Sequence, residues 1–277
     1  MKKTDRFITI ALVLVLVTGL SLLLYPTVSN WWNSRVSSRA VSSYMENVGV
    51  IDNEEYNKMI EDAKAYNQSL LSRQNGFALN DGLRAQYDTL LDVSGGIMAY
   101  IEIPSIQVEL PIYHGTSEPV LQIAVGHLEW TSLPVGGEST HVGLSGHRGL
   151  PSARLFTDLD KLVVGDIFVI HILDEKITYE VDQIKIVEPH NSEDLLIEEG
   201  KDLVTLVTCT PYGVNSHRLL VRGHRIENIA EALLVRVTAD AVIVEKLIVA
   251  PFLLVPILLV FLLIISIPNR KKRRKAK

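Results

Sequence analysis

Two long apolar segments, one near each end, constrain the topology of this chain more than any other feature. Residues 7–25 and 247–267 run for 19 and 21 positions without Asp, Glu, Lys or Arg, and each is long enough to cross a bilayer as a helix. Clusters of Lys and Arg precede the first segment and follow the second. Because basic flanks stay on the cytoplasmic side, we expect residues 1–6 and 268–277 to be cytoplasmic and residues 26–246 to be extracellular.

The first apolar segment has a second interpretation, a cleaved signal peptide. Its uncharged core is longer than the roughly 7–15 residues of a cleaved signal, and no A-x-A cleavage pattern follows it at once. We therefore favour an uncleaved membrane anchor, which together with the second segment gives two transmembrane helices in a cell-membrane protein.

The charge balance fits an exposed, acidic middle region. The chain has 277 residues with 27 Lys and Arg and 32 Asp and Glu, a formal net charge of −5. Setting aside the ten terminal Lys and Arg and the single terminal acid, Asp5, leaves 17 basic and 31 acidic residues, or about −14. An acidic surface repels phosphate backbones, so we expect no nucleic-acid partner.

Residues 26–96, directly after the first segment, have the pattern of helices. Apolar side chains recur there at helical spacing, which predicts a packed face; they are Tyr56, Met59, Ile60, Ala63, Tyr66 and Leu70. A stretch rich in Gly and Asn at residues 74–82 interrupts the helical pattern, because these residues favour turns.

From Ile97 the pattern changes to short β-rich runs separated by Gly, Pro, Asn or Asp. Such spacing predicts a mainly β domain, an antiparallel sandwich or barrel, and we assign residues 97–228 to it. After this domain, residues 229–246 return to helical spacing and lead toward the second apolar segment. The sequence thus predicts one extracellular β-domain with helical regions on both sides.

Cys209 is the single cysteine, and its position makes it the first candidate for chemistry. It ends an apolar, β-branched run that reads LVTLVTC, a turn of sequence TPYGVNS follows, and a second strand pattern begins at His217. An odd cysteine in an exported domain suggests a reactive thiol or intermolecular pairing, and the alternative is a small buried apolar residue. The spacing of Cys209 from the histidines does not match structural zinc sites, so we expect no metal.

A reactive thiol needs a proton carrier and a cation, because at neutral pH only a few per cent of an ordinary thiol is ionised. Of the eight histidines, His147 ends one strand pattern just as Cys209 ends another, whereas His141 and His171 lie inside strand patterns and are expected to be structural. Arg218 and Arg222 share one face of the last strand. Arg218 is closer to the loop and is preferred, with Arg222 as the competitor.

These residues belong to a block that closely resembles the active site of sortases, the cysteine transpeptidases of Gram-positive cell surfaces. The block reads TLVTCTPYGVNSHRLLVRGHR, and further blocks of the same kind span residues 101–116, 125–137, 144–162 and 179–189. The resemblance covers roughly residues 97–226, and the subgroup it is similar to is class C, the pilus-assembling sortases. Two membrane spans also fit class C, since housekeeping sortases usually have only an N-terminal anchor.

The resemblance implies a sortase β-barrel of eight strands with short helices, and it implies roles for individual residues. Cys209 would be the nucleophile, His147 the general acid and base, and Arg218 the group that stabilises the substrate carbonyl or oxyanion. His127, Thr208 and Tyr212 are further candidates for contacts with the substrate.

The same resemblance implies a reaction and its partners. The enzyme would cleave an LPXTG-like sorting signal of a pilin or other surface protein between Thr and Gly and pass the acyl group to a pilin lysine, with no cofactor. The alternative acceptor is a peptidoglycan amine of the cell wall. A distant alternative is a surface-binding β-domain with an inert cysteine.

Two positions depart from the class C pattern. Class C sortases usually carry an Asp-Pro-aromatic lid motif ahead of the barrel, whereas residues 74–82 offer only Phe77 and Asp81 as lid candidates. We expect a mobile or degenerate lid there, because the segment is rich in Gly and Asn. The second departure is Trp130, where the family pattern leads us to expect a small residue. Trp130 either shapes the acceptor groove or only packs.

Overall fold

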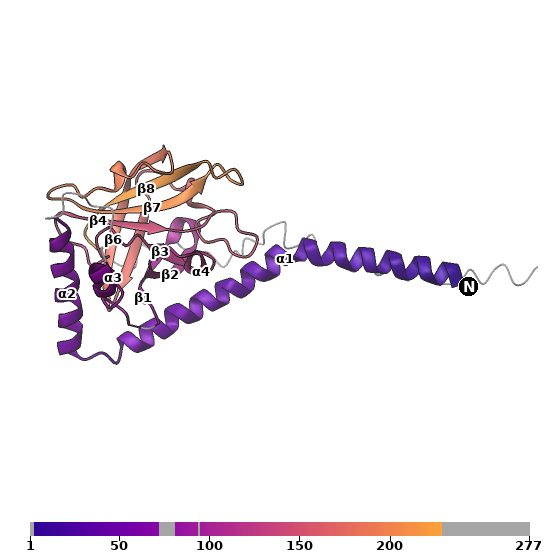
Figure 1. Cartoon of the computed structure of the whole chain (residues 1–277), viewed down its shortest axis with the longest axis horizontal. Coiled ribbons are helices and arrows are strands. Elements are labelled where there is room, and N and C mark those ends of the chain that lie inside the picture. Colours follow the sequence, from indigo (N-terminus) through magenta and orange to yellow (C-terminus); the bar gives the residue numbers. More distant parts are fainter. Residues whose placement is uncertain (1–2, 72–80, 94, 229–277) are drawn as a thin grey trace, which may run out of the picture. The chain divides into compact units, whose positions relative to one another are not determined.

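The computed structural model describes residues 3–71, 81–93 and 95–228. Its helices are α1 (Lys3–Val48), α2 (Asn53–Leu71), α3 (Asp81–Tyr87) and α4 (Glu118–Leu121), and its 3-10 turns are η1 (Pro104–Ile106), η2 (Leu159–Lys161) and η3 (Glu193–Leu195) (Figure 1). Its strands are β1 (Ile97–Ile103), β2 (Val108–His114), β3 (Val125–His127), β4 (Thr140–Ser145), β5 (Ile167–Ile172), β6 (Glu175–Val187), β7 (Asp202–Thr210) and β8 (His217–Arg225).

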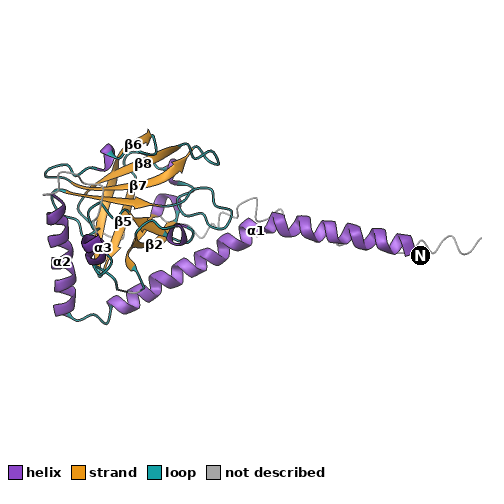
Figure 2. Ribbon diagram, viewed as in Figure 1, coloured by secondary structure: helices purple, strands orange, loops and turns teal. Residues whose placement is uncertain are grey.

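The eight strands close into a barrel in the order β1-β2-β3-β4-β7-β8-β6-β5, and Figure 2 shows them in orange with the helices outside. Closure leaves no sheet edge open around the ring. The predicted eight-stranded barrel is therefore confirmed. The expectation of a purely antiparallel arrangement is wrong, because β2–β3 and β4–β7 pair in parallel. Each parallel pair requires a crossover, and the long connection between β4 and β7, which includes β5 and β6, provides one of them.

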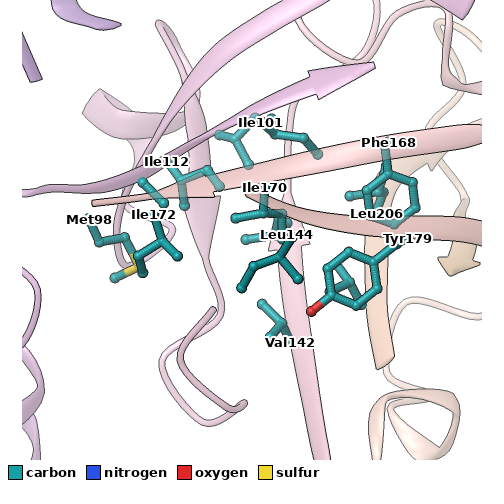
Figure 3. Close-up of a cluster of buried hydrophobic side chains, with 14 of the residues drawn as sticks. Met98, Ile101, Ile112, Val142, Leu144, Phe168, Ile170, Ile172, Tyr179 and Leu206 are labelled. Carbon is teal, nitrogen blue, oxygen red and sulfur yellow. The ribbon is translucent and has the colours of Figure 1, made fainter. Parts of the chain in front are cut away.

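The inside of the barrel is filled by alternate residues of its strands, as the two-residue repeat of a strand requires. Leu144 of β4, Ile170 of β5 and Leu206 of β7 are fully buried and belong to one continuous cluster with Phe168 and Tyr179 (Figure 3). Burying one such side chain stabilises the fold by about 1.5–3 kcal/mol. The odd-numbered residues of β7 consequently lie on the outer face of the barrel.

Helix α2 packs on the barrel with the face that its sequence predicts. Ile60, Ala63, Tyr66 and Leu70 are buried in the main core. The buried amide of Asn67 accepts a hydrogen bond from the backbone N of Leu133 at 2.7 Å and donates one to its carbonyl oxygen at 3.0 Å. The packing role expected for this stripe is confirmed.

Helix α1 continues without interruption through Pro26. Its residues 11–48 include a window apolar enough to cross a membrane, with a mean hydropathy of 2.2 and no burial. From Val28 onward α1 belongs to the compact unit of the barrel, where the hydroxyl of the buried Tyr44 donates to the carbonyl of Met98. The predicted connector, residues 229–246, and the second span, residues 247–267, lie outside the described residues.

Candidate active site

Strands β4 and β7 run parallel and end close to His147 and Cys209. Their parallel register pairs each β4 residue with the β7 residue 62 positions later, from Thr140–Asp202 to Ser145–Val207. The alignment continues beyond β4, because the hydroxyl of Thr208 donates to the carbonyl oxygen of Gly146 at 2.7 Å. Continued by two more residues, the same offset would bring His147 level with Cys209, and neighbouring strands of a sheet lie about 5 Å apart.

Arg218 reaches the same place from the other side of β7. In the antiparallel β7–β8 pair it is the residue directly opposite Cys209, so both side chains lie on one face with Cβ atoms about 5 Å apart. Its guanidinium donates to the carbonyl oxygens of Asn215 and His217, at 3.3 and 3.1 Å. These bonds hold the cation at the start of β8, next to the thiol.

All three side chains lie on the outer face of the barrel and keep access to solvent. Cys209 is half-buried, and 26% of the His147 side chain is exposed. His147 Nε2 lies 3.6 Å from a carboxylate oxygen of Glu118 in α4. The pKa of the Glu118 carboxyl is lowered, first by a hydrogen bond from Gln122 and then by the charge of His147. The site thus combines a thiol, an imidazole and a guanidinium in one row.

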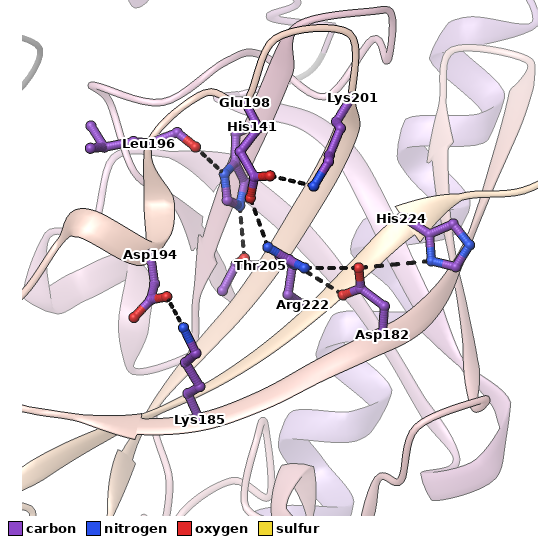
Figure 4. A network of polar contacts seen from close by, with 10 residues as sticks. All are labelled: His141, Asp182, Lys185, Asp194, Leu196, Glu198, Lys201, Thr205, Arg222 and His224. Atoms are coloured by element: carbon purple, nitrogen blue, oxygen red, sulfur yellow. Dashed lines mark hydrogen bonds and ion pairs between the residues drawn. The ribbon is translucent and has the colours of Figure 1, made fainter.

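Arg222, the competitor, has a different environment. It forms a bidentate pair with Asp182 at 2.9 and 3.0 Å and bonds Glu198 at 2.8 Å (Figure 4). The hydrogen bonds that it donates to Asp182, together with the negative charges of Asp182 and Glu198, raise the pKa of its guanidinium. It lies opposite Thr205, four residues along β7 from Cys209. Arg222 therefore holds the segment before β7 against the barrel, and only Arg218 faces the thiol.

His141, also drawn in Figure 4, belongs to this structural network. It is 1% exposed, and its ring nitrogens contact the carbonyl oxygen of Leu196 and the hydroxyl of Thr205, at 2.7 and 2.8 Å. Burial lowers its pKa. These contacts agree with the structural role expected for His141. His171 on β5 is 7% exposed and pairs with Glu102, which also agrees with a structural role.

The structure buries His127 on β3, where it pairs with Leu144 of β4. It is completely buried, with Nδ1 2.9 Å from the hydroxyl of Tyr87 and Nε2 2.8 Å from the carbonyl oxygen of Ser132. Burial lowers its pKa to about 4. Both ring nitrogens already have protein partners, so the geometry corrects the expectation of a substrate contact to a structural role.

Thr208 and Tyr212, the other two candidates, lie on either side of the nucleophile. Thr208 is 2% exposed and its hydroxyl is taken by Gly146, so the structure gives it an aligning role instead of a substrate contact. Tyr212 is 61% exposed in the β7–β8 turn and its ring lies beside Gly149, close to the His147 loop. Of the two, Tyr212 remains open to a substrate.

Trp130 packs on the outer face of the barrel, against residues that neighbour Cys209 and Arg218 along their strands. It contacts an apolar cluster formed by Leu195, Val207 and Leu220, which Leu128 and Val187 also border. Val207 and Leu220 are opposite one another, two residues from Cys209 and Arg218 along their strands. The large side chain at position 130 therefore helps to build the apolar surface next to the thiol. No signal in a single sequence marked this contact, because it joins segments about 80 residues apart.

The lid candidates cannot be placed in the same way. Phe77 lies outside the described residues, and Asp81 is described only as the first residue of α3. Among the side chains that the structure describes, no three His, Cys, Asp or Glu residues gather as metal ligands. The expectation of no cofactor stays a prediction.

A thiol, an imidazole and a guanidinium at neighbouring strand ends of a closed β-barrel are the groups that a cysteine acyltransferase needs, as nucleophile, proton carrier and oxyanion-binding cation. Comparison with known proteins agrees with this class. Residues 101–226 match the model of the sortase domain.

Solved structures extend the likeness over most of the described chain. Sortase C1 from Streptococcus agalactiae is 53% identical with a TM-score of 0.66, covering 69% of this chain and all of that one. Sortase C of Streptococcus pneumoniae is 45% identical with a TM-score of 0.63, covering 69% of this chain and 98% of that one.

More distant relatives match a smaller part of this chain. Sortase D of Bacillus subtilis is 30% identical over 136 residues, which are 48% of this chain and 66% of that protein. Sortase A of Bacillus anthracis is 28% identical over 127 residues, 46% of this chain and 59% of that protein. The chain thus spans roughly three fifths to two thirds of these relatives' length. Together, the comparisons show that the chain belongs to the sortase family of cysteine transpeptidases, and its matches include sortases of class C.

Proposed function

We propose that this protein is a membrane-anchored pilin transpeptidase. It cleaves an LPXTG-like sorting signal between Thr and Gly through a thioacyl-enzyme on Cys209, and it joins the acyl group to a pilin lysine. The proposal is supported by the strand registers: Arg218 pairs with Cys209 across β7 and β8, and His147 follows β4, which runs parallel to β7. Each residue has a separate task in the two half-reactions.

In the first half-reaction the Cys209 thiolate attacks the carbonyl carbon of the substrate threonine. The carbonyl oxygen gains negative charge, which the Arg218 guanidinium stabilises by charge-assisted hydrogen bonds. The bond to glycine then breaks, and the leaving amine takes a proton from the imidazolium of His147. The products are a thioester on Cys209 and a free glycine amine.

In the second half-reaction the neutral His147 accepts a proton from the incoming lysine amine. The amine attacks the thioester carbon, Arg218 again stabilises the oxyanion, and the Cys209 thiolate leaves. An isopeptide bond joins the two proteins and the enzyme returns to its starting state. Proton donation and acceptance alternate on one imidazole, so no further base is required.

The pilin acceptor is supported by the relatives and by the sequence pattern. The S. pneumoniae sortase C is described for its pilin substrate specificity, and a similar S. agalactiae enzyme is the sortase C1 of a pilus island. Two apolar segments with basic outer flanks support an anchored enzyme with cytoplasmic termini and an extracellular barrel.

The test uses the full-length protein in detergent with a sorting-signal peptide. Intact-mass measurement should find the acyl fragment on the protein, and since Cys209 is the single cysteine, Cys209→Ala is a complete control. Adding a lysine-bearing pilin fragment should then release the adduct as an isopeptide-linked product. If the acyl group is transferred only to a peptidoglycan amine, the protein anchors proteins to the cell wall and does not assemble pili. If the Cys209 thiol stays unmodified under all conditions, the proposed transpeptidase activity is refuted.

A further inference from the structure

Arg148 follows the proposed catalytic histidine in sequence, and its charged side chain is almost completely buried. Only 9% of the side chain is exposed. Its Nη2 pairs with Asp160 in η2, and its Nη1 donates to the hydroxyl of Thr210 at 3.3 Å. Its Nε is buried without a hydrogen-bond partner in the described part of the chain. Burying a guanidinium with incomplete partners is costly, which argues for a role other than stability.

The bond to Thr210 extends the β4–β7 alignment past the row. Arg148 and Thr210 are 62 residues apart, the offset that also relates Gly146 to Thr208 and the paired residues of the two strands. The last backbone hydrogen bond between the two segments is from Gly146 N to the Val207 carbonyl, at 3.0 Å. Beyond it, side chains alone maintain the alignment.

His147 and Cys209 lie between these two side-chain contacts. The Thr208–Gly146 bond fixes one side, and the Arg148–Thr210 bond fixes the other. Thr208 and Thr210 are even-numbered residues of β7, on the opposite face of the strand from Cys209. The backbone N of Phe156 also donates to the carbonyl oxygen of His147 at 3.1 Å, but that bond ties the loop to itself. The Arg148–Thr210 bond is the contact that ties the residue after His147 to β7.

Arg148 also connects this pair to two further segments. Through Asp160 it holds η2, and its guanidinium carbon lies 6.0 Å from the ring centre of Tyr212 in the β7–β8 turn. The neighbouring Gly149 has φ +76° and a Cβ there would lie 3.0 Å from the same ring. The side chain therefore sits where the loop after β4, η2 and the turn after β7 meet.

We propose that Arg148 is a positioning residue that keeps His147 in line with Cys209 through its bond to Thr210. The inference rests on the proposed function, since it assigns those two residues the proton transfer and the nucleophilic attack. It differs from the proposed catalytic roles, because the Arg148 guanidinium bonds Asp160 and Thr210 and not the thiol. Its effect should be on the transition state, with substrate affinity unchanged.

The test compares the alkylation of Cys209 by iodoacetamide across pH in the full-length protein. This readout depends on the pairing of His147 with the thiol and needs no sorting signal, so it stays informative if the proposed substrate is wrong. His147→Ala supplies the profile expected when the pairing is lost. Thr210→Val and Arg148→Lys each remove the Arg148–Thr210 hydrogen bond and leave Asp160 with a cationic partner. The pH profiles of alkylation of both variants should move toward that of His147→Ala.

A double variant and a matched control complete the design. Because both changes remove one contact, Arg148→Lys/Thr210→Val should shift the profile no further than either single variant. Arg154→Met removes an arginine of the same loop that pairs with Asp158 at the surface, and its profile should match the wild type. Profiles of Thr210→Val that overlay the wild type, or additive shifts in the double variant, would overturn the proposal.

Steady-state kinetics with a sorting-signal peptide give a second measure. Misplacing a proton carrier by about 1 Å can lower the rate on the order of 10²-fold, so kcat should fall in Arg148→Lys and Thr210→Val while KM stays the same. A loss confined to KM would assign Arg148 to substrate binding and contradict the positioning role.

Discussion

The hydroxyl of Thr208 donates to the carbonyl oxygen of Gly146 at 2.7 Å and aligns the ends of β4 and β7. Each partner immediately precedes a residue of the proposed catalytic row, His147 on one chain segment and Cys209 on the other. In the proposed mechanism, this one buried hydrogen bond helps to align a proton carrier and a nucleophile that lie 62 residues apart in sequence. Thr208 itself is buried, so its role is internal.

Replacing Thr208 with Val should therefore affect both stability and activity. Loss of the bond leaves the Gly146 carbonyl unsatisfied in a buried position, which costs about 1–3 kcal/mol. We expect a lower denaturant midpoint and slower thioacylation of Cys209, measured by quenched mass spectrometry. Thr89→Val, which alters an exposed threonine bonded only to Gln86, should change neither. An unaltered acylation rate in Thr208→Val would show that the bond does not align the site.

Gly146 itself should not tolerate a side chain. A Cβ there would lie 2.6 Å from Cδ2 of Phe156, a fully buried core residue. Gly146→Ala is expected to lose about 1–3 kcal/mol of stability through overpacking and to displace His147. Gly49→Ala, where the nearest atoms would be 3.5 Å away, is the matched control in thermal unfolding. Equal melting temperatures for the two variants would contradict the contact.

The strand ends at Ser145 and Thr210 could be predicted from sequence, because turn-forming residues follow each β-branched run. That local signal was sufficient to bring His147 and Cys209 into one list of candidates. The parallel pairing of β4 with β7 could not be predicted in the same way, since it depends on how β5 and β6 fill the connection between them.

The environment of individual side chains was also beyond a single sequence. The strand pattern sets the face on which Arg218 and Arg222 lie, but it does not show that Asp182 and Glu198 already engage Arg222. In the same way, the partners of His127 come from α3 and from a loop. Such contacts depend on tertiary packing. From the sequence alone, Arg218 can be preferred to Arg222 only because it lies closer to the loop after Cys209.

His127 should remain uncharged throughout the physiological range. Burial lowers its pKa to about 4, compared with about 6.5 in an unfolded chain. Stability from the neutral ring is therefore fully present above pH ~6.5 and is lost as pH falls toward about 4. An NMR titration of the histidine Cε1–H signals should show no protonation of His127 above pH ~5. A midpoint above about 6 would contradict its complete burial.

The two arginines of β8 should separate activity from stability. Arg218→Ala removes the cation opposite Cys209 and should lower kcat/KM by roughly 10²–10³-fold, as loss of an oxyanion donor does, with little change in melting temperature. Arg222→Ala leaves Asp182 and Glu198 without their shared partner and should lower the melting temperature, while the folded fraction keeps most of its activity.

Both variants are compared at one temperature well below either transition, so that unfolding does not enter the rates. Thioacylation by a sorting-signal peptide is measured for activity, and circular dichroism for the melting temperature. Arg218→Lys keeps a charge but not the planar fork of donors, and it should recover only part of the rate. If Arg218→Ala keeps a near-normal acylation rate and Arg222→Ala loses most of it, Arg222 and not Arg218 stabilises the oxyanion. The oxyanion-binding cation must be the one whose removal slows acylation.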